Sequence, residues 1–154
     1  MPLFSGEYSS TLDDKNRVII PSDLRKAAGR AGEAGYYVTR GLDACVAIYT
    51  AERFEEIGTG ATGERSRLST AGRMLERALF ANARSASCDK QGRLRIPPAL
   101  TERLEIDREV VIVGVNDRIE VWDKARWSDM LAQAEAELEG RADEVYGRGR
   151  EGQG

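Results

Sequence analysis

Two short stretches of the sequence place an aspartate and an arginine four residues apart, each just before an Ile-Pro pair. The first, LDDKNRVIIP, contains Asp13 and Arg17, and the second, CDKQGRLRIP, contains Asp89 and Arg93. An aspartate that begins a turn can accept hydrogen bonds from backbone N–H groups. An arginine can donate to a carboxylate, a phosphate or the edge of a base. These residues therefore suit either a hairpin closed by an ion pair or a turn that contacts nucleic acid.

The residues between the two charged positions differ in an informative way. Asn16 precedes the first arginine, and Gly92 precedes the second. Asn and Gly are the residue types that best tolerate positive φ, which a short hairpin turn needs. Lys15 and Lys90 add positive charge to the two turns, whereas Gln91 stands in the second turn at the place of Lys15. The sequence thus predicts two turns of similar shape and unequal charge.

The two turns belong to a longer internal repeat. Placed 76 residues apart, the two stretches share Asp, Arg, Ile, Pro and a following Leu. Placed 73 residues apart, VTRGLDACVAIYTAERF (38–54) matches VIVGVNDRIEVWDKARW (111–127) at glycine, apolar and aromatic positions. The change of offset is a length difference around the Gly-rich segment 29–35, which is expected to be a loop, where such differences cost little free energy. The chain therefore contains two copies of a unit of about 45 residues.

Each unit has the same predicted course, β-β-α-β-β followed by a further helix. A short strand enters the turn and a second leaves it, a proline opens a short helix, and two β-rich runs follow. The strands are expected at 11–13, 17–20, 36–41 and 46–49 in the first unit and at 87–89, 93–96, 109–115 and 118–122 in the second. The short helices are SDLRKAA and PALTERL, and Phe54 and Trp127 lie in the helices that follow the units.

Four short strands make a poor core alone, so we expect the two units to pair about a pseudo-twofold axis. The expected fold is α+β and mainly β, a small interleaved barrel made of both units. An amphipathic helix is expected from about Ser69 to Ala83, with Ser69 or Thr70 as its N-cap, and another from about Lys124 to Leu138. The Gly-rich polar residues beyond are expected to be disordered. The predicted divisions are a first unit 7–54, a linker 55–82, a second unit 83–127 and a C-terminal helix with a tail 128–154.

The composition excludes several classes of protein. Hydrophobic content of 41% and charged content of 32% are typical of a soluble globular protein. The longest apolar run, VVIVGV, is too short to cross a bilayer, and the N-terminal residues lack the pattern of a secretory signal. Histidine is absent, which removes His-based triads and most transition-metal sites. Cys45 and Cys88 are expected to be small apolar side chains. We expect a cytoplasmic protein with no metal and no cofactor.

The net charge of −3 does not exclude a nucleic-acid partner, because the charge is unevenly distributed. From Ser128 to the end, three arginines stand against seven acidic residues, a net charge of −4, so the remaining residues carry +1. Electrostatic attraction depends on local patches rather than on the total. An acidic C-terminal segment is compatible with a basic face elsewhere.

The doubled Asp-x-x-x-Arg turn, together with the ending GVNDRIEVWDKARW, resembles the MraZ family of bacterial transcriptional regulators, which belong with the AbrB-like swapped-hairpin DNA-binding proteins. The resemblance runs from about Phe4 to Leu131. It implies two tandem AbrB-like units that bind double-stranded DNA at short direct repeats upstream of the division and cell-wall gene cluster. It also implies a homo-oligomer, a ring of several subunits, located in the cytoplasm and associated with the nucleoid.

The resemblance assigns the turns to DNA. Arg17 and Arg93 could make bidentate bonds to guanine or reach a phosphate, and the lysines are expected to contact phosphates. The family's first turn usually has Gly where this chain has Asn16, and Asn can adopt the same conformation. The residues expected to contact DNA are Lys15, Arg17, Lys90 and Arg93, with Arg25 and Lys26 widening the basic face. The residues expected to form the turns are Asp13, Asn16, Asp89 and Gly92.

Other interpretations stay open at this point. The Asp and Arg of each turn could simply close a hairpin through a surface ion pair. The chain could be an antitoxin-like module that binds both DNA and a protein partner, although only Val145 and Tyr146 past Leu138 offer large apolar anchors. Asp13 and Asp89 could form an acid–base dyad of an enzyme. We expect no enzyme, because an arginine four residues on holds each carboxylate ionised. A purely structural ring protein is the remaining alternative.

Overall fold

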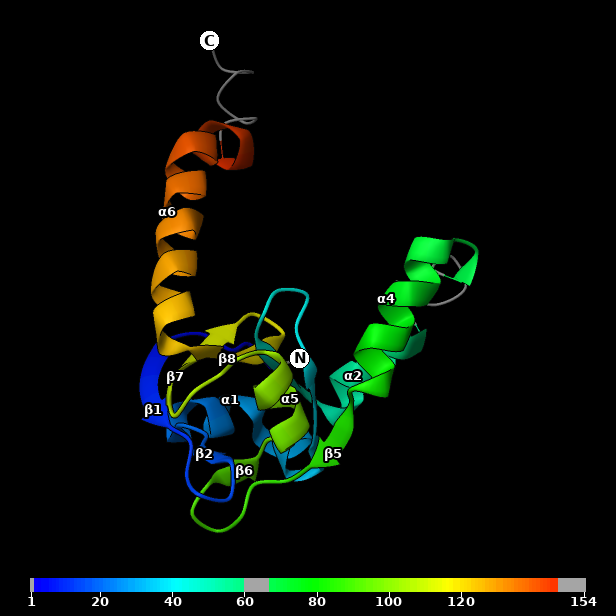
Figure 1. Ribbon diagram of the computed structural model, residues 1–154, viewed down its shortest axis with the longest axis vertical. Helices are drawn as coiled ribbons and strands as arrows, with labels where there is room; N and C mark the ends of the chain where they lie inside the picture. The colour runs from blue at the N-terminus through cyan, green and yellow to red at the C-terminus, as the bar shows by residue number, and fades with distance from the viewer. Residues whose placement is uncertain (1, 60–66, 147–154) are drawn as a thin grey trace. The chain divides into compact units, whose positions relative to one another are not determined.

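The structure, a computed structural model, describes residues 2–59 and 67–146 (Figure 1). The chain divides into one unit that ends at Asp123 and a second that begins at Lys124. In the first unit the elements are β1 (Glu7–Thr11), β2 (Arg17–Ile19), α1 (Ser22–Glu33), β3 (Tyr36–Arg40), β4 (Val46–Thr50), α2 (Ala51–Thr59), α4 (Thr70–Ala81), β5 (Arg84–Ala86), β6 (Arg93–Arg95), α5 (Pro98–Arg103), β7 (Glu109–Val115) and β8 (Arg118–Asp123). The described part of the second unit is one helix, α6 (Lys124–Tyr146).

The strands interleave the two sequence repeats. A six-stranded antiparallel sheet has the order β1-β7-β8-β4-β3-β5, and β2 pairs with β6 in a separate two-stranded sheet, which we call the ribbon. Exchanging each strand with its counterpart in the other repeat reverses the order of the large sheet and leaves its pairing unchanged. The α+β fold and the pseudo-twofold relation of the two repeats are thereby confirmed. The expected barrel takes the form of a six-stranded sheet with a separate ribbon.

The core draws equivalent residues from both repeats. Three apolar pairs related by the 76-residue offset are buried in one cluster: Val18 and Leu94, Ile20 and Ile96, and Leu24 and Leu100. The first pair comes from the ribbon and the last from the short helices that follow it. Burial of side chains of this size stabilises a fold by about 1.5–3 kcal/mol each. The ribbon and the two turns beside it are therefore anchored to the core at every second residue.

Two local expectations were wrong. The strands that enter the turns were expected at 11–13 and 87–89, but β1 ends at Thr11 and β5 at Ala86. β1 pairs with β7 and β5 with β3, so both find their partners in the other repeat rather than across their own turn. The Gly-rich segment 29–35 was expected as a loop, yet α1 continues to Glu33. Gly29 alone leaves helical geometry there (φ 56°, ψ −137°), because glycine can absorb the bend without a Cβ clash.

The two amphipathic helices expected from about Ser69 to Ala83 and from about Lys124 to Leu138 are confirmed as α4 and α6, and their ends differ from those expected. α4 begins as expected, and Ser69 Oγ accepts a hydrogen bond of 2.9 Å from the Gly72 backbone N. It meets α2 through the rings of Phe54 and Phe80, whose centroids lie 4.9 Å apart. Residues 60–66 lie outside the described residues, as do 147–154 of the expected tail. α6 runs to Tyr146 instead of ending near Leu138.

None of the helices over residues 2–59 and 67–146 is long and apolar enough to cross a membrane. The two cysteines are free thiols, Cys45 buried and Cys88 half-buried. Burial raises the pKa of the Cys88 thiol, which is the behaviour of a small packed side chain rather than a reactive one.

Candidate nucleic-acid interface

The first turn is closed by its own aspartate. Asp13 Oδ1 accepts hydrogen bonds from the backbone N of Lys15 at 2.9 Å and of Arg17 at 2.8 Å, and Oδ2 accepts from Arg17 Nε at 2.8 Å. The backbone adds a bond of 3.0 Å from the Asn16 N to the Asp13 carbonyl. Asn16 has positive φ (60°), which allows the chain to reverse within so few residues.

The second turn repeats this geometry atom for atom. Asp89 Oδ1 accepts from the backbone N of Gln91 at 3.0 Å and of Arg93 at 2.9 Å, and Oδ2 accepts from Arg93 Nε at 2.7 Å. Gly92 takes the positive φ (80°) that Asn16 takes in the first turn. Each aspartate therefore shapes a turn and also fixes the guanidinium of its arginine by one edge. Figure 1 shows the two turns projecting beside each other beyond β2 and β6.

The two turns also meet electrostatically. Arg17 Nη1 lies 3.9 Å from Asp89 Oδ2, so the arginine of one turn faces the aspartate of the other. Hydrogen bonds from the Arg17 backbone N, together with the Arg17 side chain, hold the pKa of Asp13 below its ordinary value. Bonds from Arg93 lower the pKa of Asp89 in the same way. An arginine between two ionised carboxylates opposes the proton sharing that an acid–base dyad needs.

The ribbon separates its side chains into an inner and an outer face. The register pairs Arg17 with Arg95, Val18 with Leu94, and Ile19 with Arg93. Val18 and Leu94 are buried. Because side chains alternate along a strand, the other four lie together on the outer face, where Ile19 and Arg95 are exposed and the two turn arginines are half-buried.

Arg95 is the residue that the sequence reasoning missed. It lies directly opposite Arg17, and backbone bonds from Ile20 N to Gly92 O and from Ile96 N to Asn16 O flank the ribbon. By alternation, the Arg17–Arg95 pair is the non-hydrogen-bonded type, in which side chains approach most closely. Within the described part of the chain Arg95 makes no ion pair, and like charges directly opposite are destabilising. The alternation of RLR at 93–95 could have revealed this cation.

The two turns are fastened to the opposite repeat by different side chains. Asn16 Nδ2 donates to the Ile96 carbonyl at 2.7 Å and to Thr101 Oγ1 at 3.1 Å. At the equivalent place in the second turn, Arg25 Nε donates to the Ile20 carbonyl at 2.9 Å. A Cβ built on Gly92 would lie 2.7 Å from Arg25 Cζ, so the guanidinium occupies the space that a side chain there would need.

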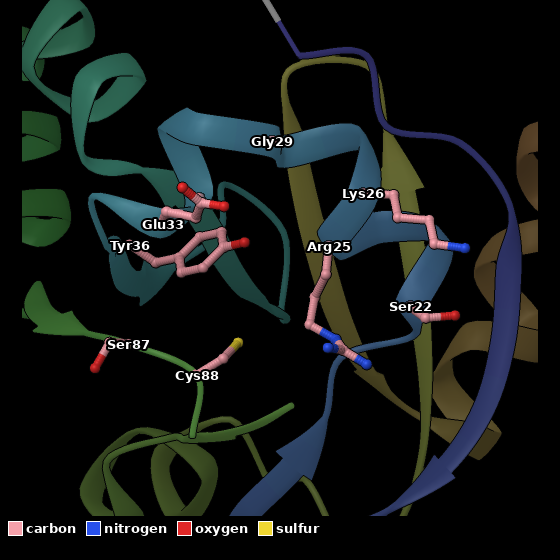
Figure 2. Close-up of a pocket in the computed structure, with 9 residues that line it drawn as sticks. Ser22, Arg25, Lys26, Gly29, Glu33, Tyr36, Ser87 and Cys88 are labelled. Carbon is pink, nitrogen blue, oxygen red and sulfur yellow. The ribbon is translucent and has the colours of Figure 1, made fainter. Parts of the chain in front are cut away.

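The remaining predicted contacts differ in exposure. Lys15, Lys90 and Lys26 are exposed, whereas Arg25 is half-buried. Figure 2 shows the side chains of Arg25 and Lys26 leaving α1 in different directions, Lys26 pointing away from Cys88. Arg25 lines a pocket between α1 and the segment that leads into the second turn. Its position against Gly92 gives it a structural contact, and a role for it on DNA stays a prediction, as do the roles of the other cations.

Comparison of the chain with known proteins shows which family its sequence matches. The family described as "MraZ protein, putative antitoxin-like" matches residues 3–77 and 79–148. Proteins named "Transcriptional regulator MraZ" are similar along most of their length. That of Pediococcus pentosaceus is 34% identical over 143 residues, covering 93% of this chain and 96% of the relative. That of Moorella thermoacetica is 33% identical with the same coverage, and that of Finegoldia magna is 37% identical over 125 residues, 81% of this chain and 84% of the relative.

Proposed function

This chain belongs to the MraZ family, and we propose that it is a sequence-specific DNA-binding transcriptional regulator rather than an enzyme. Its curated relatives are named transcriptional regulators. The observation that carries the proposal is the outer face of the ribbon, where Arg17 and Arg95 lie opposite each other beside Arg93. These three arginines outnumber the two turn aspartates that pair with Arg17 and Arg93. The excess positive charge on a rigid two-stranded ribbon suits a polyanion whose major groove admits such a ribbon.

In this proposal the two turns enter the major groove together. Asp13 and Asp89 hold the Nε edge of each arginine, which leaves the Nη groups of Arg17 and Arg93 to donate to guanine O6 and N7 or to phosphate. The exposed lysines at the tips, Lys15 and Lys90, contact phosphates and position the ribbon. The two aspartates themselves repel DNA, and their role in this proposal is to hold the guanidinium groups of Arg17 and Arg93 in place before DNA binds.

We propose that the functional form is a homo-oligomer, a ring that presents several ribbons to short direct repeats upstream of the division and cell-wall gene cluster. Exposed apolar side chains in and just before α4 support self-association: Leu68 is 84% exposed and Met74 60%. Several weak contacts on one duplex gain affinity through effective concentration. Sedimentation velocity should then show a single species several times the mass of one chain, and Met74→Glu should reduce its size. A stable monomer at micromolar concentration would remove the ring from the proposal.

The site of action follows from this function: the cytoplasm, on the nucleoid. DNase footprinting tests the specific part of the proposal on the duplex upstream of the chain's own gene. Protection is expected over two or more copies of one short repeat, and Arg17→Ala or Arg93→Ala should abolish it while the fold persists. Protection spread evenly over the duplex, or unchanged in both variants, would contradict it.

An antitoxin-like module is the second candidate, favoured by the wording of the family description. In that case a protein partner should remain bound when the chain is purified at native level from its own cells. Mass spectrometry of the purified complex distinguishes the two candidates. One small partner in equal amount to the chain supports the antitoxin reading, and copies of this chain alone support the regulator.

A further inference from the structure

We propose that Ile19 contacts the C5-methyl group of a thymine, so that the half of the ribbon contributed by β2 reads thymine while the half contributed by β6 does not. The inference rests on the proposed DNA-binding function and names what one specific residue recognises. It concerns a side chain outside both Asp-x-x-x-Arg turns, on the strand that follows the first of them.

Ile19 is exposed where its neighbours are not. Ile19 is 54% accessible, while Val18 and Ile20 on either side are 1% and 0% accessible. The strand alternation therefore turns Ile19 outward. A single exposed aliphatic side chain is common on protein surfaces and by itself indicates nothing. Its surroundings decide the interpretation.

Those surroundings are cationic. Ile19 lies opposite Arg93 in the register, and Arg17 and Arg95 share its face of the ribbon. When these arginines bind a duplex, Ile19 faces the same groove between them. The thymine C5-methyl is the apolar group that base pairs present in the major groove. Contact with it would bury apolar surface on both molecules.

The pseudo-twofold relation makes the inference specific. Ile19 and Arg95 occupy equivalent positions in the two repeats, each two residues beyond the turn arginine. The ribbon therefore presents Arg-x-Ile on one strand and Arg-x-Arg on the other. A symmetric reader would favour a palindromic site. This ribbon should favour an asymmetric one, with thymine on the β2 side and a guanine or phosphate contact on the β6 side.

A second copy of the chain is the rival occupant of this face. Two ribbons meeting face to face would bring together six arginines and only four turn aspartates, and this excess of like charge is unfavourable. A duplex instead neutralises them. Charge complementarity thus selects nucleic acid over self-association for this surface.

The test is a double-mutant cycle that combines removal of the Ile19 side chain with removal of the C5-methyl group of one thymine. Each thymine of the bound upstream duplex is replaced in turn by deoxyuridine, which lacks only the C5-methyl group, and affinity for the full-length protein is measured by fluorescence anisotropy. At one or more positions the wild-type chain should lose about fourfold in affinity, the value of one buried methyl-sized group. Ile19→Ala should bind the thymine duplex more weakly by a similar factor, and it should not distinguish thymine from uracil at that position.

Two controls keep the result interpretable. Ile19→Val retains branched methyl groups and should keep the preference, and Arg95→Ala should lower affinity overall while keeping it. An equal loss of affinity on uracil substitution in the wild type and in Ile19→Ala, or no loss of affinity at any position, would overturn the inference. Neither result would contradict the proposed DNA-binding function. A change in sedimentation of Ile19→Ala would overturn it by identifying a subunit interface. Absence of any preference for the upstream duplex would instead remove the proposed function, and the inference with it.

Discussion

Asn16 donates a hydrogen bond of 2.7 Å to the carbonyl oxygen of Ile96, in the other repeat of the chain. The equivalent carbonyl, that of Ile20, accepts its bond from Arg25 instead, and the Arg25 guanidinium lies against Gly92. Where the turn carries a side chain, the neighbouring helix carries the short Thr101, and where the turn carries glycine, the helix carries the long arginine. The two turns keep the same shape, although the hydrogen-bond donor to this carbonyl comes from the turn in one repeat (Asn16) and from the helix in the other (Arg25).

This exchange predicts energetic coupling between Asn16 and Thr101. Asn16→Gly should lower the free energy of unfolding by about 1 kcal/mol, because it removes the bonds to Ile96 and Thr101. Thr101→Arg should lower the free energy of unfolding by more, because Thr101 is only 5% exposed and the Asn16 side chain occupies the space that the longer arginine would need. The double variant recreates the Gly–Arg arrangement of the other turn. In urea unfolding its loss should be smaller than the sum of the two single losses by about 1 kcal/mol, and strict additivity would contradict the exchange.

A side chain at Gly92 should destabilise the fold. Gly92→Ala puts a Cβ on a residue at a φ of 80°, where L side chains are strained at a cost of about 1–3 kcal/mol, and it also displaces the end of the Arg25 side chain. The free energy of unfolding should fall by that amount in chemical denaturation. Gly140→Ala on α6 is the matched control, because nothing lies within 4 Å of its Cβ. It should leave stability unchanged or raise it, and an equal loss in both variants would contradict the strain assigned to Gly92.

The two turn aspartates should make stability depend on acid pH. Their pKa values are lowered in the folded chain by bonds from Arg17 and Arg93. The stabilisation they provide is therefore fully present above the ordinary aspartate pKa of about 4 and is lost as the pH falls through the lowered folded values. Asp13→Asn/Asp89→Asn should show a shallower decline in the free energy of unfolding between roughly pH 5 and pH 2 than the wild type. Parallel declines would mean that these carboxylates are not held ionised by the turns.

Arg95 should matter for DNA binding although it lies outside both turns. Arg95→Ala removes one cation from the outer face of the ribbon, so the slope of log affinity against log salt should decrease in magnitude by about 1. The fold should persist, because Arg95 is exposed. Arg141→Ala, on α6 and ion-paired with Glu137 at 2.9 Å, is the charge-matched control. An unchanged slope for Arg95→Ala would place the bound duplex elsewhere.

Much of this arrangement could be predicted from the sequence, because equivalent positions of an internal repeat are expected to have equivalent places in the fold. The offset of 76 residues pairs Val18 with Leu94 and Ile20 with Ile96, and these are the buried contacts that join the two repeats. The positive φ of Asn16 follows from local chemistry, since few residue types adopt it. Local rules of this kind transfer directly from sequence to structure.

What could not be predicted depends on contacts between distant segments. The strands that enter the turns pair with the opposite repeat, a choice that no local pattern records. That Arg17 and Arg95 lie side by side depends on the register of the ribbon, because a shift by one residue would place them on opposite faces. The hydrogen bond from Asn16 to Ile96 spans the two repeats for the same reason.

The most direct test of the account is the affinity of the full chain for the duplex upstream of its own gene. Fluorescence anisotropy would compare that duplex with a scrambled one of equal composition at several salt concentrations. Tighter binding to the native duplex, with a salt slope that reports several phosphate contacts and is reduced by Arg17→Ala and by Arg93→Ala, is the predicted result. Equal affinity for both duplexes, or a slope indifferent to both arginines, would contradict the claim that the ribbon reads DNA.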